Sequence, residues 1–202
     1  MSGWLTKDEL LAPLARLRGD AVVVTSMGVV RPWARLSTSP LDFASADSAM
    51  GHTADFALGL ALARPERRVI CLNGDGSTLM TLGTLVTIAE AAPANLVLFV
   101  IVNGTYELTG NQPIPGAARV DFAGLARAAG IPRVDSFEER LAYERALPEL
   151  LACEGPVAVV VRVEPGDEGP LLRGVPGEPP YLSVSLAEST RRLRAVLTGV
   201  QE

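Results

Sequence analysis

Two polar segments, each at the end of an apolar run, carry the residues that could do chemistry. Asp75 lies between two glycines just after the run 68–73, and Asn103 closes the run 95–103. A carboxylate, an amide oxygen and a nearby backbone carbonyl are hard oxygen ligands, which suit Mg²⁺. If the two runs are neighbouring parallel strands, both side chains reach one crevice at the carboxyl ends of the strands. The sequence therefore predicts a magnesium site where these two segments meet.

An anion site is predicted beside the metal. Gly76 and Ser77 lie at the start of a predicted helix over residues 77–92. Free N–H groups and the helix dipole attract an anion at such a start, and glycine lets a phosphate approach the backbone closely. Adjacent metal and anion sites are what a magnesium diphosphate needs.

Other sites for phosphate, metal or nucleophilic catalysis fit the sequence less well. The P-loop pattern is absent, and the dinucleotide pattern G-x-G-x-x-G would need glycine in place of Leu79. His52 is the sole histidine and the two cysteines are isolated, so zinc lacks ligands. A Ser/His/Asp hydrolase stays open through His52, although no G-x-S-x-G elbow occurs.

Apolar runs that alternate with helical patterns indicate the elements that position these residues. Runs apolar on both faces predict a parallel sheet covered on both sides. The predicted fold is therefore α/β, a doubly wound and mostly parallel sheet with helices on both faces. Strands are predicted over 21–25, 68–73, 95–103 and 156–163, and helices over 5–17, 53–64, 77–92, 121–130, 137–153 and 185–197.

Several features refine this organisation. Thr6 and Glu9 predict a capping box at the first helix, and Pro148 predicts a bend or break in the helix 137–153. Residues 1–166 are predicted to form the binding domain. Residues 167–202, a Pro- and Gly-rich connector with a terminal helix, are predicted to belong to the same domain.

Composition excludes some classes of partner. The chain has 202 residues and a formal net charge of −5, and it has no dense basic stripe, so no nucleic-acid partner is expected. Two distant cysteines indicate no disulfide framework and fit a reducing cytoplasm. No apolar run reaches the roughly 18 residues of a membrane span, so none is expected.

The ordered motifs resemble those of thiamine diphosphate-dependent enzymes. "GDGS" at 74–77, a spacer of 26 residues after Gly76, and "NGTYELTG" at 103–110 resemble the cofactor motif of that family. Together with "SAMGH" at 48–52 and "DFAGLARAAG" at 121–130, they most resemble the sulfopyruvate and phosphonopyruvate decarboxylase group. The resemblance covers roughly residues 44–166 and implies the diphosphate-binding (C-terminal) domain of the family.

The resemblance also implies roles for particular residues. The side chains of Asp75 and Asn103 and the carbonyl of Thr105 would bind Mg²⁺. Met50 would wedge the cofactor into its bent form. The expected cofactor contacts are Met27, Gly28, Ser48, Met50, Gly74, Gly76, Ser77 and Tyr106, and the candidate catalytic residues are His52 and Glu107. His52 could equally be a packed or capping residue, and Glu107 an exposed loop residue. The segment "TSMGVVRPWARL" at 25–36 departs from the family pattern and keeps only Arg31 of it.

The implied activity is decarboxylation of a 2-oxo acid to an aldehyde and CO₂ with thiamine diphosphate and Mg²⁺. In the family a second, pyrimidine-binding domain supplies the glutamate that activates the cofactor. This chain resembles a β-type subunit that would depend on a separate α-type partner for that glutamate, in a hetero-oligomer. Two alternatives stay open: a carboligase of the acetolactate or acyloin synthase type, and a non-catalytic cofactor-binding subunit.

Overall fold

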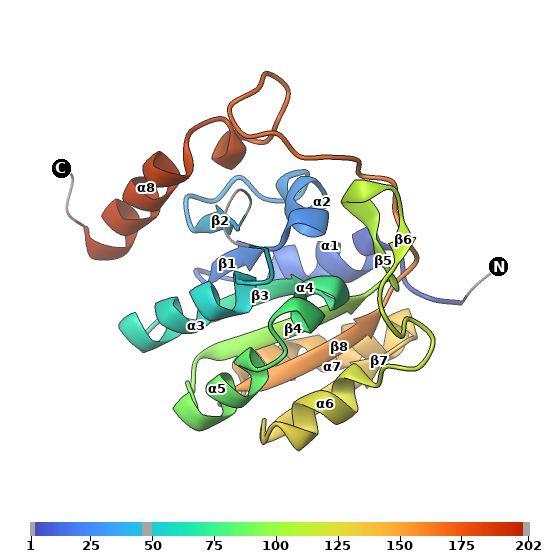
Figure 1. Ribbon diagram of the computed structural model, residues 1–202. Coiled ribbons are helices and arrows are strands. Elements are labelled where there is room, and N and C mark those ends of the chain that lie inside the picture. The colour runs from blue at the N-terminus through green and yellow to red at the C-terminus, as the bar shows by residue number, and fades with distance from the viewer. Residues whose placement is uncertain (1–2, 46–49, 200–202) are drawn as a thin grey trace.

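Six parallel strands form one sheet at the centre of the molecule (Figure 1). The computed structural model describes residues 3–45 and 50–199. The strand order is β2-β1-β3-β4-β8-β7, so the strands that end near Asp75 and Asn103 are neighbours, as predicted. The strands are β1 (Val22–Thr25), β2 (Asp42–Ala44), β3 (Val69–Gly74), β4 (Leu96–Val102), β7 (Arg133–Phe137) and β8 (Val157–Arg162).

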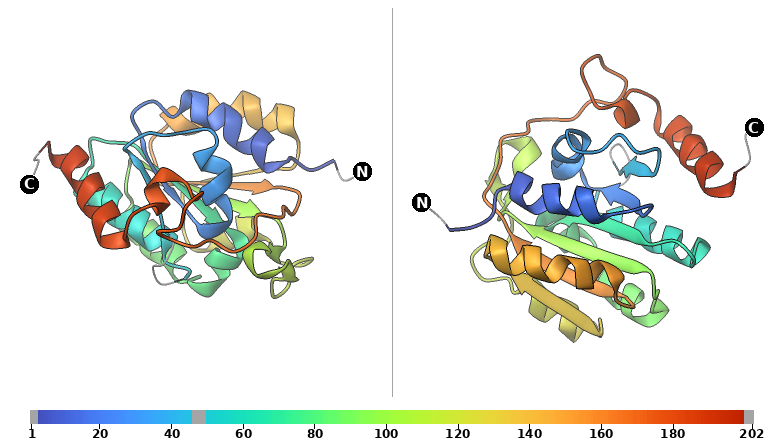
Figure 2. Two further views of the ribbon diagram at one scale, coloured as in Figure 1. Left: turned by 90° about the horizontal axis from the view of Figure 1, so that it is seen from above. Right: turned by 180° about the vertical axis from the view of Figure 1, so that it is seen from behind.

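Helices cover both faces of this sheet, which confirms the predicted α/β class. Seen from above, α1 (Lys7–Leu17) and α7 (Arg140–Ala152) lie on one face (Figure 2). The other face is covered by α3 (Thr53–Ala63), α5 (Thr84–Ala91), α6 (Phe122–Ala128) and α8 (Leu186–Thr198). Successive residues of β4 point to opposite layers, so Val97 packs with the first group and Leu98 with the second. Burial on both faces explains why this strand is apolar throughout.

The first helix begins where its sequence predicts. The Thr6 hydroxyl accepts a hydrogen bond from the Glu9 N–H at 3.2 Å. The Glu9 carboxylate accepts one from the Thr6 N–H at 2.8 Å, which completes the capping box. On the apolar side of α1, the buried Tyr143 hydroxyl of α7 donates to the Leu10 carbonyl at 2.9 Å. These contacts fix α1 on the sheet and place Lys7 at its first turn.

The helix predicted over 77–92 is two helices, so that prediction is wrong in its extent. The first is α4 (Asp75–Met80), and α5 follows after a break at residues 81–83. Thr81 leaves the helical conformation, with φ −134° and ψ 48°, and its hydroxyl donates to the Gly51 carbonyl at 2.6 Å. The hydrogen bond of Thr81 thus joins the end of α4 to the segment before α3.

Two edge strands were not predicted. β2 has only three residues, and β7 is partly exposed along its length, so neither shows the continuous apolar run of the central strands. The helix predicted over 137–153 begins later, at Arg140, because Phe137 ends β7. It then continues through Pro148 to Ala152. A short hairpin of β5 (Thr105–Tyr106) and β6 (Gln112–Pro113) was also not predicted.

The segment after β8 returns across the top of the molecule in Figure 1 before it reaches α8. It passes over the single-turn helix η1 (Met27–Val29) and α2 (Val30–Ala34). Leu171 and Leu182 are buried against Val30 and Ala44. Arg31 donates to the Pro170 carbonyl at 2.7 Å and forms an ion pair with Glu178. These contacts favour the prediction that residues 167–202 belong with the preceding domain.

Within residues 3–45 and 50–199, none of the helices has the length and apolar character that crossing a bilayer requires.

Candidate functional site

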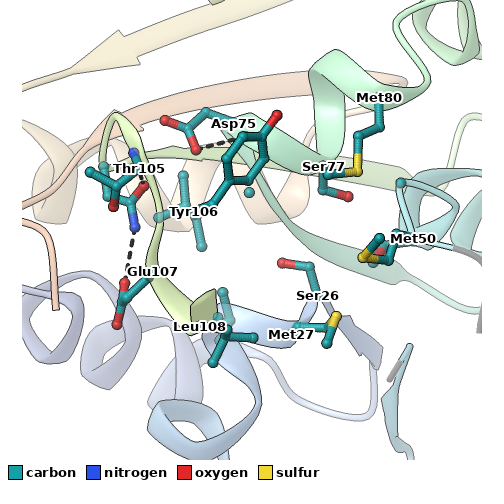
Figure 3. A pocket seen from close by; sticks show the side chains of 18 of the residues that line it. Ser26, Met27, Met50, Asp75, Ser77, Met80, Thr105, Tyr106, Glu107 and Leu108 are labelled. Atoms are coloured by element: carbon teal, nitrogen blue, oxygen red, sulfur yellow. Dashed lines mark hydrogen bonds between the residues drawn. The ribbon is translucent and has the colours of Figure 1, made fainter. Parts of the chain in front are cut away.

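A pocket of about 280 Å³ opens at the carboxyl ends of β1, β3 and β4 (Figure 3). Its walls come from the segments that follow these strands and from the first turn of α1. Most residues predicted for the site line this one pocket: Met27, Gly28, Met50, Gly74, Asp75, Gly76, Ser77, Asn103, Thr105, Tyr106 and Glu107. The sequence did not predict that Lys7, Ser26, Met80 and Leu108 line it as well.

The carboxylate of Asp75 joins the two predicted segments. Asp75 is 2% exposed. One of its oxygens accepts a hydrogen bond from the Gly76 N–H and the other from the Gly104 N–H, each at 2.7 Å. Burial raises the pKa of Asp75 above its usual value, while the N–H donors of Gly104 and Gly76 oppose that rise. The contact with Gly104 brings the loop after β4 directly against Asp75.

Asp75 differs from the other buried carboxylates in what it contacts. Asp42 and Glu107 each form an ion pair, with Arg18 and Lys7 respectively, whereas Asp75 accepts from backbone N–H groups. A buried carboxylate is stabilised by a cation. Among the described residues, no cluster of three or more His, Cys, Asp or Glu side chains could hold a metal ion. A cation at Asp75 would therefore need amide, carbonyl, water or ligand oxygens to complete its shell.

Asn103 lies on the neighbouring strand end and supplies such an oxygen. Its Oδ1 accepts from the Thr105 N–H at 2.9 Å, and its Nδ2 donates to Glu107 Oε2 at 2.9 Å. The pairing of β3 with β4 places Gly74 beside Ile101, so the two loops leave the sheet together. Asp75, Asn103 and Thr105 are thereby brought to the same pocket, as their positions in the sequence predict.

The start of α4 forms a close wall beside Asp75. A Cβ on Gly76 would lie 2.5 Å from Cε1 of the Tyr106 ring, so only glycine fits there without displacing the ring. The Ser77 hydroxyl is buried and has no hydrogen-bond partner among the described residues. A buried hydroxyl without a partner is costly, and this one could donate to an anion in the pocket. The predicted anion site thus has a free donor at Ser77, whereas the space that glycine leaves at position 76 is filled by the Tyr106 ring.

The opposite end of the pocket is apolar. Met50 and Met80 lie at that end in Figure 3, away from Thr105 and Glu107. Met50 is 67% exposed and follows the segment 46–49. Gly51 has φ +89°, and a Cβ there would lie 2.8 Å from Met80 Cβ, so the Met50 backbone is held tightly against the end of α4. Flexible thioether side chains fill irregular apolar surfaces, which suits the wedge role predicted for Met50.

Lys7 and Glu107 form a buried ion pair on the polar side of the pocket. The Lys7 Nζ lies 2.6 Å from Oε1 and 2.5 Å from Oε2 of Glu107, and their side chains are 9% and 2% exposed. The same ammonium donates to the Gly28 carbonyl at 2.9 Å. Lys7 is the only lysine in the chain. This was the one feature of the sequence that could have indicated a role for Lys7 in the site.

One predicted residue, His52, is not among the described residues that line the pocket. The His52 side chain is half exposed and hydrogen-bonds the Asp55 carboxylate, which also accepts from the Thr84 hydroxyl. Ser48 lies outside the described residues. Arg31, the one residue kept from the family pattern in its segment, binds Glu178 and carbonyls of the connector. The catalytic role of His52 and the cofactor contact of Ser48 therefore stay predictions.

Comparison with known proteins agrees with this geometry. Residues 26–161 match the family described as "Thiamine pyrophosphate enzyme, C-terminal TPP binding domain". The chain is 38% identical over 186 residues to phosphonopyruvate decarboxylase from Streptomyces viridochromogenes, covering 92% of this chain and 44% of that protein. It is 37% identical over 163 residues to sulfopyruvate decarboxylase subunit beta from Methanothermobacter thermautotrophicus, covering 79% of this chain and 84% of that protein.

A solved structure shares the fold. A putative thiamin diphosphate-dependent enzyme from Mycobacterium smegmatis superposes with a TM-score of 0.69 at 25% identity, covering 80% of this chain and 32% of that one. The chain thus spans less than half of the phosphonopyruvate decarboxylase and about a third of this enzyme. The match to the family model and the identity to these relatives show that the chain belongs to the thiamine pyrophosphate enzymes, within their C-terminal, TPP-binding domain.

Proposed function

We propose that this chain is the diphosphate-binding subunit of a thiamine diphosphate- and Mg²⁺-dependent 2-oxo-acid decarboxylase. The observation that carries the proposal is the contact of Asp75 with the loop of Asn103 inside one pocket. The relatives named above act, by their names, on phosphonopyruvate and sulfopyruvate. A 2-oxo acid of this type is therefore the proposed substrate class.

The residues present fit a magnesium diphosphate. Asp75 and the Oδ1 of Asn103 would hold the metal, with the Thr105 carbonyl as the third protein ligand. Phosphate oxygens and water would complete the shell, as Mg²⁺ prefers. The unpartnered Ser77 hydroxyl would donate to the diphosphate. One ligand, the magnesium diphosphate, would then provide a cation for the Asp75 carboxylate and an acceptor for the Ser77 hydroxyl.

The protein's part in the reaction is to bind, orient and exclude water. When bound, thiamine diphosphate supplies the carbon nucleophile and the electron sink for loss of CO₂ from a 2-oxo acid. Met27, Met50 and Met80 give the pocket an apolar wall. Once the proposed partner covers Met50 and Met80, this wall would lower the local dielectric and keep water from the reacting carbon. Asp75 and Asn103 fix the cofactor through its metal.

A partner chain is part of the proposal. The chain matches most of the length of a protein named subunit beta, which suggests an α-type, pyrimidine-binding partner that supplies the activating glutamate. Lys7 is the one Lys or Arg among the described pocket-lining residues, and it is paired with Glu107. We therefore expect the partner to supply the cation for a sulfonate or phosphonate group on the substrate.

A carboligase is the second candidate. The chain is 35% identical over 174 residues to a putative acetolactate synthase large subunit from Mycobacterium tuberculosis, covering 30% of that protein. The two activities differ in their products when the assembled enzyme is given pyruvate or sulfopyruvate. Aldehyde alone supports the decarboxylase, whereas an adduct of two 2-oxo acids supports the carboligase.

The Asp75→Ala variant tests the proposal. Removal of the buried carboxylate should lower the Mg²⁺-dependent affinity for thiamine diphosphate by at least about 100-fold, because even outer-shell changes at metal sites cost roughly 10- to 100-fold. Isothermal titration calorimetry of the chain with Mg²⁺ and thiamine diphosphate measures this. Asp20→Ala is the matched control, since Asp20 is 85% exposed and pairs with Arg67 outside the pocket. Equal affinities in the two variants would refute the metal assignment.

A further inference from the structure

The ion pair of Lys7 and Glu107 has a function beyond the neutralisation of two charges. The N–H donors of the Lys7 ammonium and both oxygens of the Glu107 carboxylate are all engaged in hydrogen bonds. The Lys7 ammonium, which has three donors, contacts both Glu107 oxygens and the Gly28 carbonyl. Glu107 Oε1 also accepts from the Glu168 N–H at 3.2 Å, and Oε2 from Asn103 Nδ2 at 2.9 Å. Glu107 is therefore not free to take a proton from a substrate.

The Asn103 amide is oriented by this carboxylate. Asn103 Nδ2 donates to Glu107 Oε2 at 2.9 Å, so the NH₂ end of the amide faces Glu107. The oxygen end is then turned to the backbone of the loop, where it accepts from the Thr105 N–H. That backbone is the one whose Gly104 N–H donates to Asp75. With the amide reversed, an NH₂ group would stand where a metal needs oxygen.

We propose that the Lys7–Glu107 ion pair fixes the Asn103 amide with its oxygen toward the cofactor's metal, so that both are positioning residues. This inference rests on the proposed magnesium site. The Lys7 ammonium and the Glu168 N–H hold the Glu107 carboxylate in place, with Oε2 toward Asn103 Nδ2.

The surrounding segments keep water away from the pair. Lys7 comes from α1, 100 residues before Glu107, and Gly166 of the connector approaches from another side. A Cβ on Gly166 would lie 2.5 Å from Glu107 Oε1, so the connector packs directly on the carboxylate. The Asn111 amide donates to the Gly166 carbonyl at 3.0 Å and holds this segment in place. Three parts of the chain thus meet to orient one metal ligand.

The double variant Lys7→Met, Glu107→Met tests the inference. Replacement of both charges by apolar groups of similar volume usually preserves a fold, but it leaves Asn103 without its acceptor. We expect the affinity for Mg²⁺ and thiamine diphosphate to fall about 10- to 100-fold, while thermal unfolding stays cooperative. The matched control is Arg18→Met, Asp42→Leu, which removes another buried ion pair, outside the site. The control should bind the cofactor as the wild type does.

Two measurements on the wild-type chain test the inference even if the double variant does not fold. In ¹H–¹⁵N spectra, one Asn103 side-chain proton should be shifted downfield by its bond to a carboxylate, and Asn103→Ala assigns it. Lys7, the only lysine, should be acetylated by acetic anhydride at least about tenfold more slowly in the folded chain than in the denatured chain at the same pH, because it reacts only when the fold opens locally. An unshifted Asn103 amide or rapid acetylation of Lys7 would overturn the inference.

The outcomes also separate this inference from the proposed function. Wild-type affinity in a folded double variant, with loss of affinity in Asp75→Ala, would remove the positioning role and leave the metal site standing. Wild-type affinity in Asp75→Ala would remove the metal site itself.

Discussion

Asp75 shows how a site of this kind is built at the scale of single residues. Backbone N–H groups of Gly76 and Gly104 hold its two oxygens, and these donors oppose the rise in the pKa of Asp75 that its burial causes. Position 76 also has to be glycine, because a Cβ there would collide with the Tyr106 ring. Small changes at these positions should therefore affect ligand binding more than folding.

Gly76→Ala tests this at the residue scale. The new Cβ would meet the Tyr106 ring at 2.5 Å, so the ring must move into the pocket. We expect calorimetry to show roughly tenfold weaker binding of Mg²⁺ and thiamine diphosphate, a change of about 1.4 kcal/mol. Gly83→Ala is the matched control, since a Cβ there meets nothing within 4 Å. It should keep the affinity and raise the free energy of unfolding by about 0.4–1 kcal/mol. Equal binding in both variants would show that the close contact of Tyr106 has no part in the site.

At the scale of elements, the connector after β8 holds the loops of the site in place. Its carbonyls and Glu178 bind Arg31 of α2, and its Glu168 N–H bonds Glu107. Arg31 lies in a segment where the family pattern is mostly absent. In this chain its side chain binds the connector rather than lining the pocket. The hydrogen bond from Arg31 lowers the pKa of Glu178 below its usual value.

At low pH the connector should lose the ion pair between Glu178 and Arg31. Because the folded-state pKa of Glu178 is below the unfolded value of about 4.3, its ion pair stabilises the fold above that pH. The stabilisation is lost as the pH falls through the lower, folded-state pKa. The protection factors of residues 168–178 against hydrogen exchange, which correct for the intrinsic pH dependence of exchange, should therefore fall between about pH 5 and pH 3.

Glu178→Gln should remove that pH dependence and give low protection factors at both ends of the range. Glu66→Gln, which changes an exposed carboxylate paired with Arg64, is the control and should exchange as the wild type does. An identical pH profile in Glu178→Gln and the wild type would exclude this ion pair as the cause.

At the scale of the whole molecule, exposed apolar side chains continue from the pocket along α4 and α5. Met50, Met80, Leu82 and Val86 are 67%, 46%, 37% and 57% exposed. Contiguous exposed apolar side chains mark interaction surfaces, and the proposed partner must reach the pocket to complete the site. This rim is therefore the expected contact surface for the pyrimidine-binding chain.

Val86→Glu should weaken assembly without loss of stability, because it places a charge in a contact that excludes water. Co-purification with the native partner, followed by size-exclusion chromatography, measures the assembly. Leu141→Glu is the matched control, since Leu141 is 63% exposed on α7, in the helix layer on the other face of the sheet. Equal loss of assembly in both variants, or in neither, would contradict the assignment of this surface.

The sequence by itself determined the features that short segments encode. The capping box at Thr6 and Glu9, the central strands and the placement of Asp75 and Asn103 at strand ends follow from local patterns, and the structure confirms them. Two-sided burial makes a central strand apolar throughout, so such strands are easily recognised. The order of the motifs was enough to identify the family.

Only the tertiary structure decided the features that depend on distant contacts. The edge strands lack a clear pattern for two reasons: β2 has only three residues, and β7 is partly exposed along its length. The break after α4 depends on the bond of Thr81 to Gly51, 30 residues earlier. Lys7 meets Glu107 across 100 residues, and no local pattern encodes such a pair. The physical reason is that packing between layers, rather than spacing along the chain, brings these groups together.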